Sequence, residues 1–236
     1  MLQESFQIPV EGMAVDSVGA IFSPAAHADP TAAILLAHGA GAPMDSEFME
    51  VIAASLANEG FDVLRFQYAY AERSRIEGRR FPPDRQPKLE SVHQSALDSL
   101  RLRTSAKSIV LAGKSMGGRM SSLLVAGGLE CDGLIFLGYP LHPQGKPEKL
   151  RTAHFPEIHT PSLFLQGTRD GLCNLELLRK ALPSYGAAID LVVIEGGDHS
   201  FKVLKRLGIA QSEVHARLVH EMSTWIRANA TTTSNE

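Results

Sequence analysis

Short apolar runs alternate along the chain with stretches that carry apolar residues at helical spacing. Runs of four to six residues without polar alternation are typical of strands buried on both faces of a parallel sheet. The expected strands are residues 5–9, 18–22, 33–37, 61–66, 109–112, 133–137, 162–165 and 191–194. Because helices separate most of them, the pattern predicts an α/β fold, a mostly parallel sheet with helices on both faces.

The helices expected between these strands begin near Asp45, Leu89, Met116, Asn174 and Val214. Asp45 and Asn174 are expected N-caps, because their side-chain oxygens can accept free amide protons of the first turn. The stretch 66–89 shows no apolar periodicity before Leu89 and is expected to be irregular.

The segment 113–117 reads Gly-Lys-Ser-Met-Gly and joins the predicted strand 109–112 to a predicted helix. A G-x-S-x-G pattern in this setting is typical of a nucleophile elbow, where a strained turn exposes the serine hydroxyl. The turn brings the residues two before and two after the serine close together, so both must be small, and both are glycine. The pattern predicts Ser115 as a nucleophile.

The same residues resemble the end of a phosphate-binding P-loop. That loop needs a glycine at position 108 and irregular backbone after it. Position 108 is a serine, and residues 109–112 predict a strand. Nucleotide binding is therefore not expected.

A serine hydroxyl needs a base to take its proton and a third group to orient that base. His199 follows the strand 191–194 through a glycine-containing loop, and Asp170 follows the strand 162–165. Functional sites in parallel sheets lie beyond the carboxyl ends of the strands. We therefore expect His199 as the base and Asp170 as the orienting acid for Ser115.

Other interpretations of these residues remain. Taken singly, Asp170 could cap a helix and His199 could be a polar loop residue. Asp198 is a rival acid, but its side chain would have difficulty reaching the ring of its own neighbour.

A site for acyl transfer also needs donors for the oxyanion. The backbone N–H of Met116, directly after the nucleophile, is the first expected donor. The N–H of Ala40, in the loop after the third predicted strand, is the second, and Gly39 and Gly41 beside it are expected to contact substrate. His38 is expected to be a buried ring that ties this loop down.

The segment 66–89 carries six basic and three acidic residues. It could close over an anionic substrate or bind a partner, but a charged segment more often faces water, and we favour that interpretation. Tyr68 and Tyr70, nearer the strand, are better candidates for the substrate pocket. Tyr139, after the strand 133–137, is a further candidate for substrate binding.

Three histidines, His142, His154 and His159, lie in the proline-interrupted segment 139–161. They do not share a helical face, and no cysteine or carboxylate pattern completes a metal site. We expect neither a metal nor another cofactor. The segment is also too short for a large helical cap.

The bulk properties narrow the class of protein. With 236 residues and 44% hydrophobic content, we expect one domain over residues 1–230, followed by a frayed tail at 231–236. A net charge of −3 gives no support for nucleic acid as a partner. Two distant cysteines, no signal-peptide pattern and no membrane-spanning run favour a cytoplasmic protein without a membrane partner. Oligomeric state is not predicted.

Together the motifs resemble a small α/β-hydrolase of the dienelactone-hydrolase-like kind, over nearly the whole chain. They are Leu36-Ala37-His38-Gly39-Ala40-Gly41-Ala42, Gly113-Lys114-Ser115-Met116-Gly117-Gly118-Arg119, Gly138-Tyr139-Pro140-Leu141-His142-Pro143, Gly167-Thr168-Arg169-Asp170 and Gly196-Gly197-Asp198-His199-Ser200-Phe201. The chain order Ser, Asp, His is also that of α/β-hydrolases. The resemblance implies an eight-stranded sheet whose second strand is antiparallel.

A narrower resemblance is to a hydrolase-like subfamily related to the third regulatory subunit of the NSL histone-acetyltransferase complex, where a scaffold role is the usual view. Dienelactone hydrolases proper use a cysteine nucleophile. This chain has Ser115 at that position, so their substrate cannot be transferred to it.

The sequence thus predicts a carboxylesterase-type serine hydrolase that cleaves esters or thioesters of small soluble substrates through an acyl-enzyme. Short acyl chains are expected, since no feature marks a lipid tunnel. The alternative is a non-catalytic scaffold or binding protein, in which Lys114 could pair with a carboxylate and hinder access to Ser115. An intact Ser, Asp and His argues against that alternative.

Overall fold

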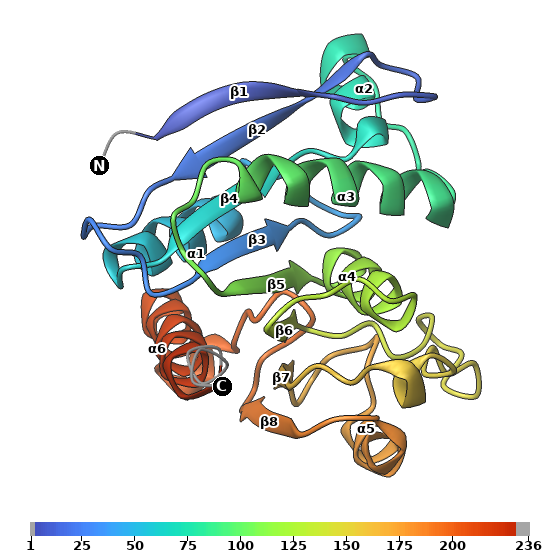
Figure 1. Cartoon of the computed structure of the whole chain (residues 1–236). Coiled ribbons are helices and arrows are strands. Elements are labelled where there is room, and N and C mark those ends of the chain that lie inside the picture. The colour runs from blue at the N-terminus through green and yellow to red at the C-terminus, as the bar shows by residue number, and fades with distance from the viewer. Residues whose placement is uncertain (1–2, 230–236) are drawn as a thin grey trace.

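The computed structural model describes residues 3–229, so the expected tail at 231–236 lies outside the described part. An eight-stranded sheet in the order β1-β2-β4-β3-β5-β6-β7-β8 forms its framework (Figure 1). The strands are β1 (Glu4–Pro9), β2 (Ser17–Ser23), β3 (Ala33–Ala37), β4 (Asp62–Phe66), β5 (Ile109–Lys114), β6 (Gly133–Leu137), β7 (Ser162–Gly167) and β8 (Ile189–Ile194). Strand β2 is antiparallel to both neighbours, and the other pairs are parallel. This is the α/β-hydrolase fold.

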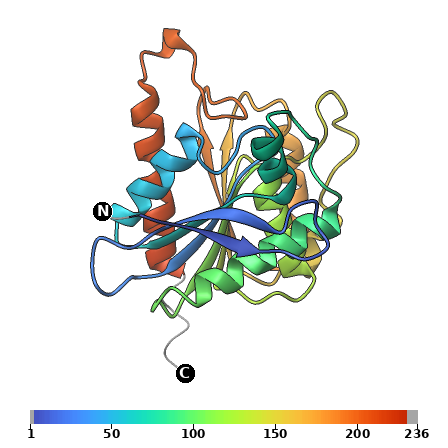
Figure 2. The same ribbon diagram turned by 90° about the horizontal axis from the view of Figure 1, so that it is seen from above.

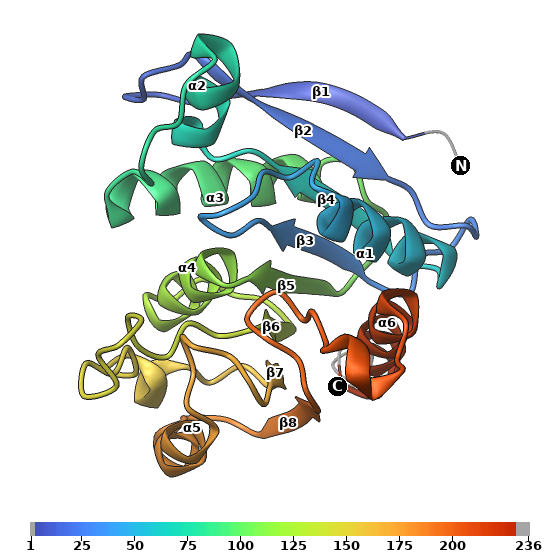
Figure 3. The same ribbon diagram turned by 180° about the vertical axis from the view of Figure 1, so that it is seen from behind.

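Helices cover both faces of the sheet (Figure 2). The α-helices are α1 (Glu47–Asn58), α2 (Ala69–Glu77), α3 (Gln86–Arg101), α4 (Met116–Ala126), α5 (Leu175–Ala181) and α6 (Gln211–Asn229). Short 3-10 turns are η1 (Phe155–Glu157), η2 (Leu182–Ser184) and η3 (Lys205–Leu207). Helices α1 and α6 lie together on one face, as seen from behind in Figure 3. Within residues 3–229 no large cap domain stands over the sheet.

The central strands show why the sequence lacks polar alternation there. Every residue of β3, β4, β6 and β7 is buried. Leu35 and Leu111 face the core beneath α3 and α4, whereas Ile34 and Val110 face the core beneath α1 and α6. Each strand therefore needs apolar residues on both sides, which accounts for the continuous apolar runs.

The expected elements are present, with shifts of a few residues at their ends. Asn174 caps α5 as predicted, and its Oδ1 accepts a 3.1 Å hydrogen bond from the N–H of Leu177. The prediction for Asp45 is wrong, because Ser46 is the N-cap residue of α1 and makes no capping bond with its side chain.

The interpretation of 66–89 as irregular is also wrong over much of its length. Helix α2 occupies Ala69–Glu77, and α3 begins at Gln86 rather than near Leu89. Helix α2 has no continuous apolar face, so its sequence gives no helical period. It is held instead by individual buried residues, including Tyr70 and Glu72, whose carboxylate accepts a hydrogen bond from the N–H of Gly19.

A buried polar network joins α3 and α4 to the end of β4. His93 on α3 contacts the hydroxyl of Tyr68 through Nδ1 at 3.0 Å and that of Ser121 on α4 through Nε2 at 3.3 Å. All three residues are fully buried. Burial lowers the pKa of His93 from its usual 6.5 to about 3, so the ring is neutral in the folded protein.

This network predicts an acid-sensitive contribution to stability. The unfolded chain binds a proton at His93 below pH 6.5 and the folded chain does not, so stability falls as pH decreases from 6.5 toward 3. Between pH 7 and 5 the loss from this one group is about 2 kcal/mol. His93→Gln should show a correspondingly smaller fall in the free energy of unfolding, measured by denaturant titration at both pH values. An identical fall in both proteins would contradict the prediction.

Candidate active site

The backbone turns sharply at Ser115, between β5 and α4. Its φ is +52° and its ψ −113°, and among residues 3–229 only Phe201 is another non-glycine residue with positive φ. Such a conformation costs about 1–3 kcal/mol and persists only where the surroundings enforce it. The strained turn expected at the nucleophile elbow is thus present.

Backbone packing around this turn explains the two glycines. A Cβ added at Gly113 would lie 2.2 Å from the backbone nitrogen of Gly118. A Cβ added at Gly117 would lie 2.5 Å from the carbonyl oxygen of Ala37, at the end of β3. The turn can therefore form only where neither residue has a side chain.

The side chains of Ser115, His199 and Asp170 form a chain of hydrogen bonds. Ser115 Oγ lies 2.8 Å from His199 Nε2, and His199 Nδ1 lies 2.7 Å from Asp170 Oδ2. Because a carboxylate can only accept, Nδ1 carries the ring proton, and Nε2 is left to accept the serine proton. The structure thus brings together the three residues that the sequence singles out, each from beyond a different strand.

Asp170 is held by more donors than the sequence indicates. Its side chain is fully buried, whereas that of His199 is 25% exposed. Oδ1 accepts a 2.8 Å bond from the N–H of Leu172, and Oδ2 also accepts a 2.6 Å bond from Nε2 of Gln166. Gln166 Oε1 in turn accepts from the N–H of Tyr139, which fixes the amide orientation. Sequence reasoning missed Gln166, because a glutamine near a strand end carries no distinguishing pattern.

The loop that carries His199 packs against the loop that carries Asp170. A Cβ added at Gly167 would lie 2.3 Å from the carbonyl oxygen of Gly197, so the two backbones touch. Asp198, the rival acid, uses Oδ1 to accept from the N–H groups of Ser200 and Lys202. It therefore shapes the turn around His199, whereas Asp170 contacts the ring.

The loop after β3 lies directly against Ser115. A Cβ added at Gly39 would lie 3.4 Å from Cβ of Ser115. His38 anchors the loop as expected, since its fully buried ring accepts from the N–H of Tyr68 and contacts the carbonyl oxygen of Gly39. Burial lowers the pKa of His38 to about 4, so the ring stays neutral at neutral pH.

The two expected oxyanion donors lie beside Ser115. Met116 is the first residue of α4, where helix geometry leaves N–H groups without an intrahelical acceptor. Ala40 follows Gly39 in the loop packed against Ser115, and it lines the same cavity as the serine.

A cavity of about 1100 Å³ opens on this site. Ser115 and His199 line it together with the loop 39–42, the start of α1 and the segment 80–83. Gly39 and Gly41, predicted to contact substrate, are both in its wall. The segment 80–83 comes from the basic stretch after β4, so part of that stretch borders the site.

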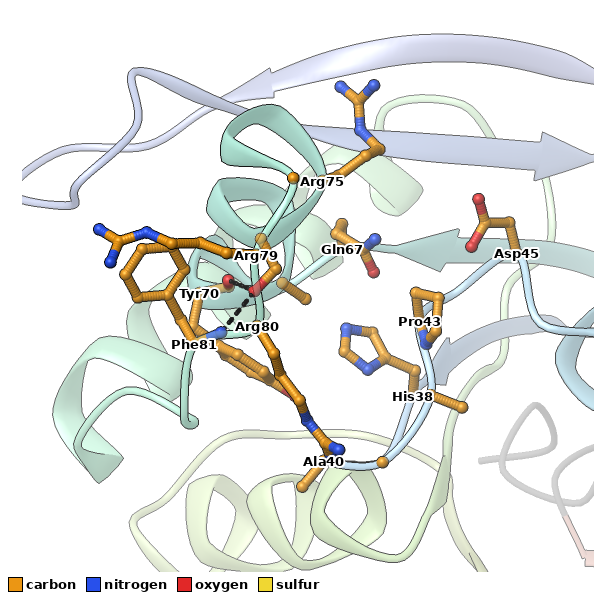
Figure 4. A pocket seen from close by; sticks show the side chains of 15 residues that line it. His38, Ala40, Pro43, Asp45, Gln67, Tyr70, Arg75, Arg79, Arg80 and Phe81 are labelled. Carbon is orange, nitrogen blue, oxygen red and sulfur yellow. Dashed lines mark hydrogen bonds between the residues drawn. The ribbon is translucent and has the colours of Figure 1, made fainter.

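A second cavity, of about 490 Å³, adjoins the first (Figure 4). The two share Arg80 and Phe81 and the loop 40–42, but Ser115 does not line the second one. Tyr70 lines this second cavity. Two of its charged residues form ion pairs, since Arg75 contacts Glu72 and Arg79 contacts Glu77.

The predictions of Tyr68 and Tyr139 as substrate-binding residues are not supported by their positions. Tyr68 is fully buried in the network with His93, and its hydroxyl is bonded there. The hydroxyl of Tyr139 donates to the carbonyl oxygen of Arg151, and its ring packs among other aromatic rings. Neither residue lines the cavity at Ser115, because each ring fills the core beneath the site.

The three histidines of the segment 139–161 contact separate partners. His142 accepts from the N–H of Asn174, and His154 contacts Ser122 on α4. Each of these rings has a local structural role. Among the described residues, no group of three His, Cys, Asp or Glu side chains is arranged to hold a metal ion.

Comparison with known proteins identifies the family. A family model described as an alpha/beta hydrolase domain matches residues 30–227. The chain belongs to the alpha/beta hydrolase family.

Several solved structures share the architecture of this chain. A dienelactone hydrolase from Anabaena variabilis has a TM-score of 0.74 at 19% identity, covering 97% of this chain and 98% of that one. An alpha-beta serine hydrolase homologue from Coxiella burnetii has a TM-score of 0.73 at 17% identity, covering 95% and 97%. The esterase domain of a Rhodothermus marinus protein has a TM-score of 0.73 at 14% identity, covering 98% and 100%. At these identities the likeness establishes the fold.

None of the helices described in this hydrolase-family chain combines the length and apolar character needed to cross a bilayer.

The packing of the elbow predicts that replacing Gly117 with alanine lowers stability, whereas the same replacement elsewhere in a helix usually raises it. Replacing a helical glycine with alanine usually stabilises a protein by about 1 kcal/mol. Gly117→Ala should instead destabilise this hydrolase-family chain by roughly 3 kcal/mol, because the new methyl group meets the Ala37 carbonyl. Chemical denaturation measures the difference. Gly171→Ala is the matched control, since a Cβ there meets no atom within 4 Å. Unchanged or increased stability of Gly117→Ala would contradict this account of the turn.

Proposed function

We propose that this protein is a serine hydrolase that cleaves carboxylic esters or thioesters through an acyl-enzyme. The observation that carries the proposal is the hydrogen-bond chain from Ser115 through His199 to Asp170, which opens on a cavity. Three such groups in this order activate a serine for attack on a carbonyl carbon.

In the first half of the proposed reaction, Ser115 Oγ attacks the carbonyl carbon while His199 Nε2 takes the hydroxyl proton. Asp170 stabilises the imidazolium that forms. The N–H groups of Met116 and Ala40 bind the tetrahedral oxyanion. His199 then gives its proton to the departing alcohol or thiol, and the acyl group remains on Ser115.

In the second half, water takes the place of the leaving group. His199 removes a proton from the water as it attacks the acyl carbon, and a second tetrahedral intermediate forms. Its collapse releases the carboxylic acid and returns the proton to Ser115 Oγ. These steps need no cofactor.

The two cysteines are not rivals for the role of nucleophile. Burial raises the pKa of Cys131 to about 12 and that of Cys173 further, so both thiols remain protonated near neutral pH. A protonated buried thiol reacts slowly. Two unpaired cysteines also support the proposal of a cytoplasmic location.

The volume and lining of the cavity indicate what size and kind of substrate it would hold. Its volume of about 1100 Å³ lies just above the range of about 300–1,000 Å³ usual for ligand pockets. Phe48, Phe81 and Leu172 supply apolar walls, and Arg80 and Lys202 add positive charge. We therefore propose a small soluble ester, with room for groups larger than the short acyl chains expected from the sequence.

No specific observation favours the alternative of a non-catalytic scaffold, or the narrower subfamily resemblance that suggests it. Lys114 lies on the cavity wall, but its ammonium group bonds to a backbone carbonyl of the His199 loop rather than to a carboxylate. It therefore does not block Ser115 in the way that the alternative requires.

Labelling with a fluorophosphonate tests the proposed nucleophile. Wild-type protein should be labelled at neutral pH, and Ser115→Ala should not. Hydrolysis of p-nitrophenyl esters should fall at least about a thousandfold in Ser115→Ala and in His199→Ala, because the members act as a unit. Ser105→Ala, an exposed serine outside the cavity, is the matched control. No labelling of folded wild-type protein would refute the proposal.

The identity of the acid gives a separate test. Asp170→Asn leaves the side-chain shape intact but presents the wrong partner to Nδ1, and kcat should fall about 10³- to 10⁴-fold. Asp198→Asn keeps the oxygen that accepts from Ser200 and Lys202, so kcat should stay within about tenfold of wild type. Steady-state ester hydrolysis measures both. The reverse ranking would assign the acid to Asp198.

A further inference from the structure

Lys114 has an unusual environment for a lysine. It is the last residue of β5 and directly precedes Ser115, and its side chain is partly buried. Its Nζ donates a short hydrogen bond to the backbone carbonyl oxygen of His199 and lies 5.5 Å from the ring centre of Phe201. The ammonium group therefore reaches behind the histidine instead of extending into solvent.

Gly138 makes room for this arrangement. A Cβ added there would lie 3.2 Å from Lys114 Nζ, 3.4 Å from the His199 carbonyl oxygen and 3.6 Å from Asp170 Oδ2. The ammonium nitrogen, the carbonyl oxygen and the triad carboxylate thus gather around one point. Gly138 also has a φ of +71°, so the backbone conformation and the lack of space both favour glycine here.

We propose that Lys114 is a positioning residue for the triad, whose ammonium group holds the His199 backbone, and with it the imidazole, in place beside Ser115. The inference rests on the function proposed above. A hydrogen bond from a charged donor is stronger than a neutral one, so this contact can fix the backbone on which the ring position depends.

The surrounding charges allow Lys114 to act in this way. Burial lowers its pKa to about 8, while the carboxylates of Asp170 and Asp198 oppose that shift, so most of the population is charged at pH 7. The other charged or titratable side chains of the cavity wall are Glu47, Arg80, Lys202 and His215. None of these four side chains bonds to the His199 ring, whose hydrogen-bond partners are Ser115 and Asp170.

Two substitutions separate the hydrogen bond from the charge. Lys114→Met removes both, and Lys114→Gln keeps a donor without the charge. The KM should stay within about twofold of wild type in both variants, because the bond acts on the position of the base rather than on substrate binding. Loss of the donor should lower kcat about 10- to 100-fold in Lys114→Met and less in Lys114→Gln.

The decisive measurement is the NMR resonance of the His199 Nδ1 proton, which is hydrogen-bonded to Asp170 and does not depend on turnover. The resonance should move or broaden in Lys114→Met and be at least partly restored in Lys114→Gln. Lys107→Met is the matched control, because this exposed lysine precedes the opposite end of β5. It removes the same charge and should leave the resonance unchanged. A wild-type resonance and a wild-type kcat in Lys114→Met would overturn the proposal.

Failure of this proposal can be told apart from failure of the proposed function. Fluorophosphonate labelling of the wild type tests whether Ser115 is active, whereas the Nδ1 proton resonance tests what Lys114 does to His199. An unlabelled wild type whose resonance changes in Lys114→Met would refute the hydrolase and support the role of Lys114. A labelled wild type whose resonance does not change in Lys114→Met would do the reverse.

Discussion

Close contact between backbone segments holds Ser115 in a conformation that residues with side chains rarely adopt. The contacts run from Gly113 to Gly118 and from Gly117 to Ala37, so the turn is tied to β3 as well as to its own helix. The same packing fixes where the hydroxyl points, where α4 begins and how near the loop after β3 approaches. The remaining features of the site depend on this one constraint.

The sheet supplies the other half of the geometry. Strands β5, β7 and β8 are parallel, so their carboxyl ends meet at one edge and deliver Ser115, Asp170 and His199 to the same place. Contact between Gly167 and Gly197 fixes the spacing of the last two loops. Gln166 contacts Asp170, and Lys114 contacts the backbone of His199. Strand ends and close contacts at glycines, rather than long side chains, therefore hold the three residues of the site in position.

The parts that could be predicted are those with a local signal. Continuous apolar runs marked the central strands, and the glycines around Ser115 marked the turn. Helix α2 escaped prediction because single contacts of Tyr70 and Glu72, rather than an apolar stripe, hold it in place. Gln166 gave no signal because a glutamine near a strand end has no distinguishing pattern, and the bond from Lys114 to the His199 carbonyl joins segments 85 residues apart. Tyr68 and Tyr139, predicted to bind substrate, lie in the core outside the cavity, because a tyrosine after a strand can fill the core as readily as a pocket.

The central claim is that the strained turn presents Ser115 to His199 on one side and to the N–H groups of Met116 and Ala40 on the other. A crystal structure of the protein after reaction with a fluorophosphonate tests it most directly. The account predicts a phosphorus–oxygen bond at Ser115, with the phosphonyl oxygen within hydrogen-bond distance of both N–H groups and His199 still bonded to Asp170. Phosphonate on another residue, or an oxygen directed away from both N–H groups, would contradict it.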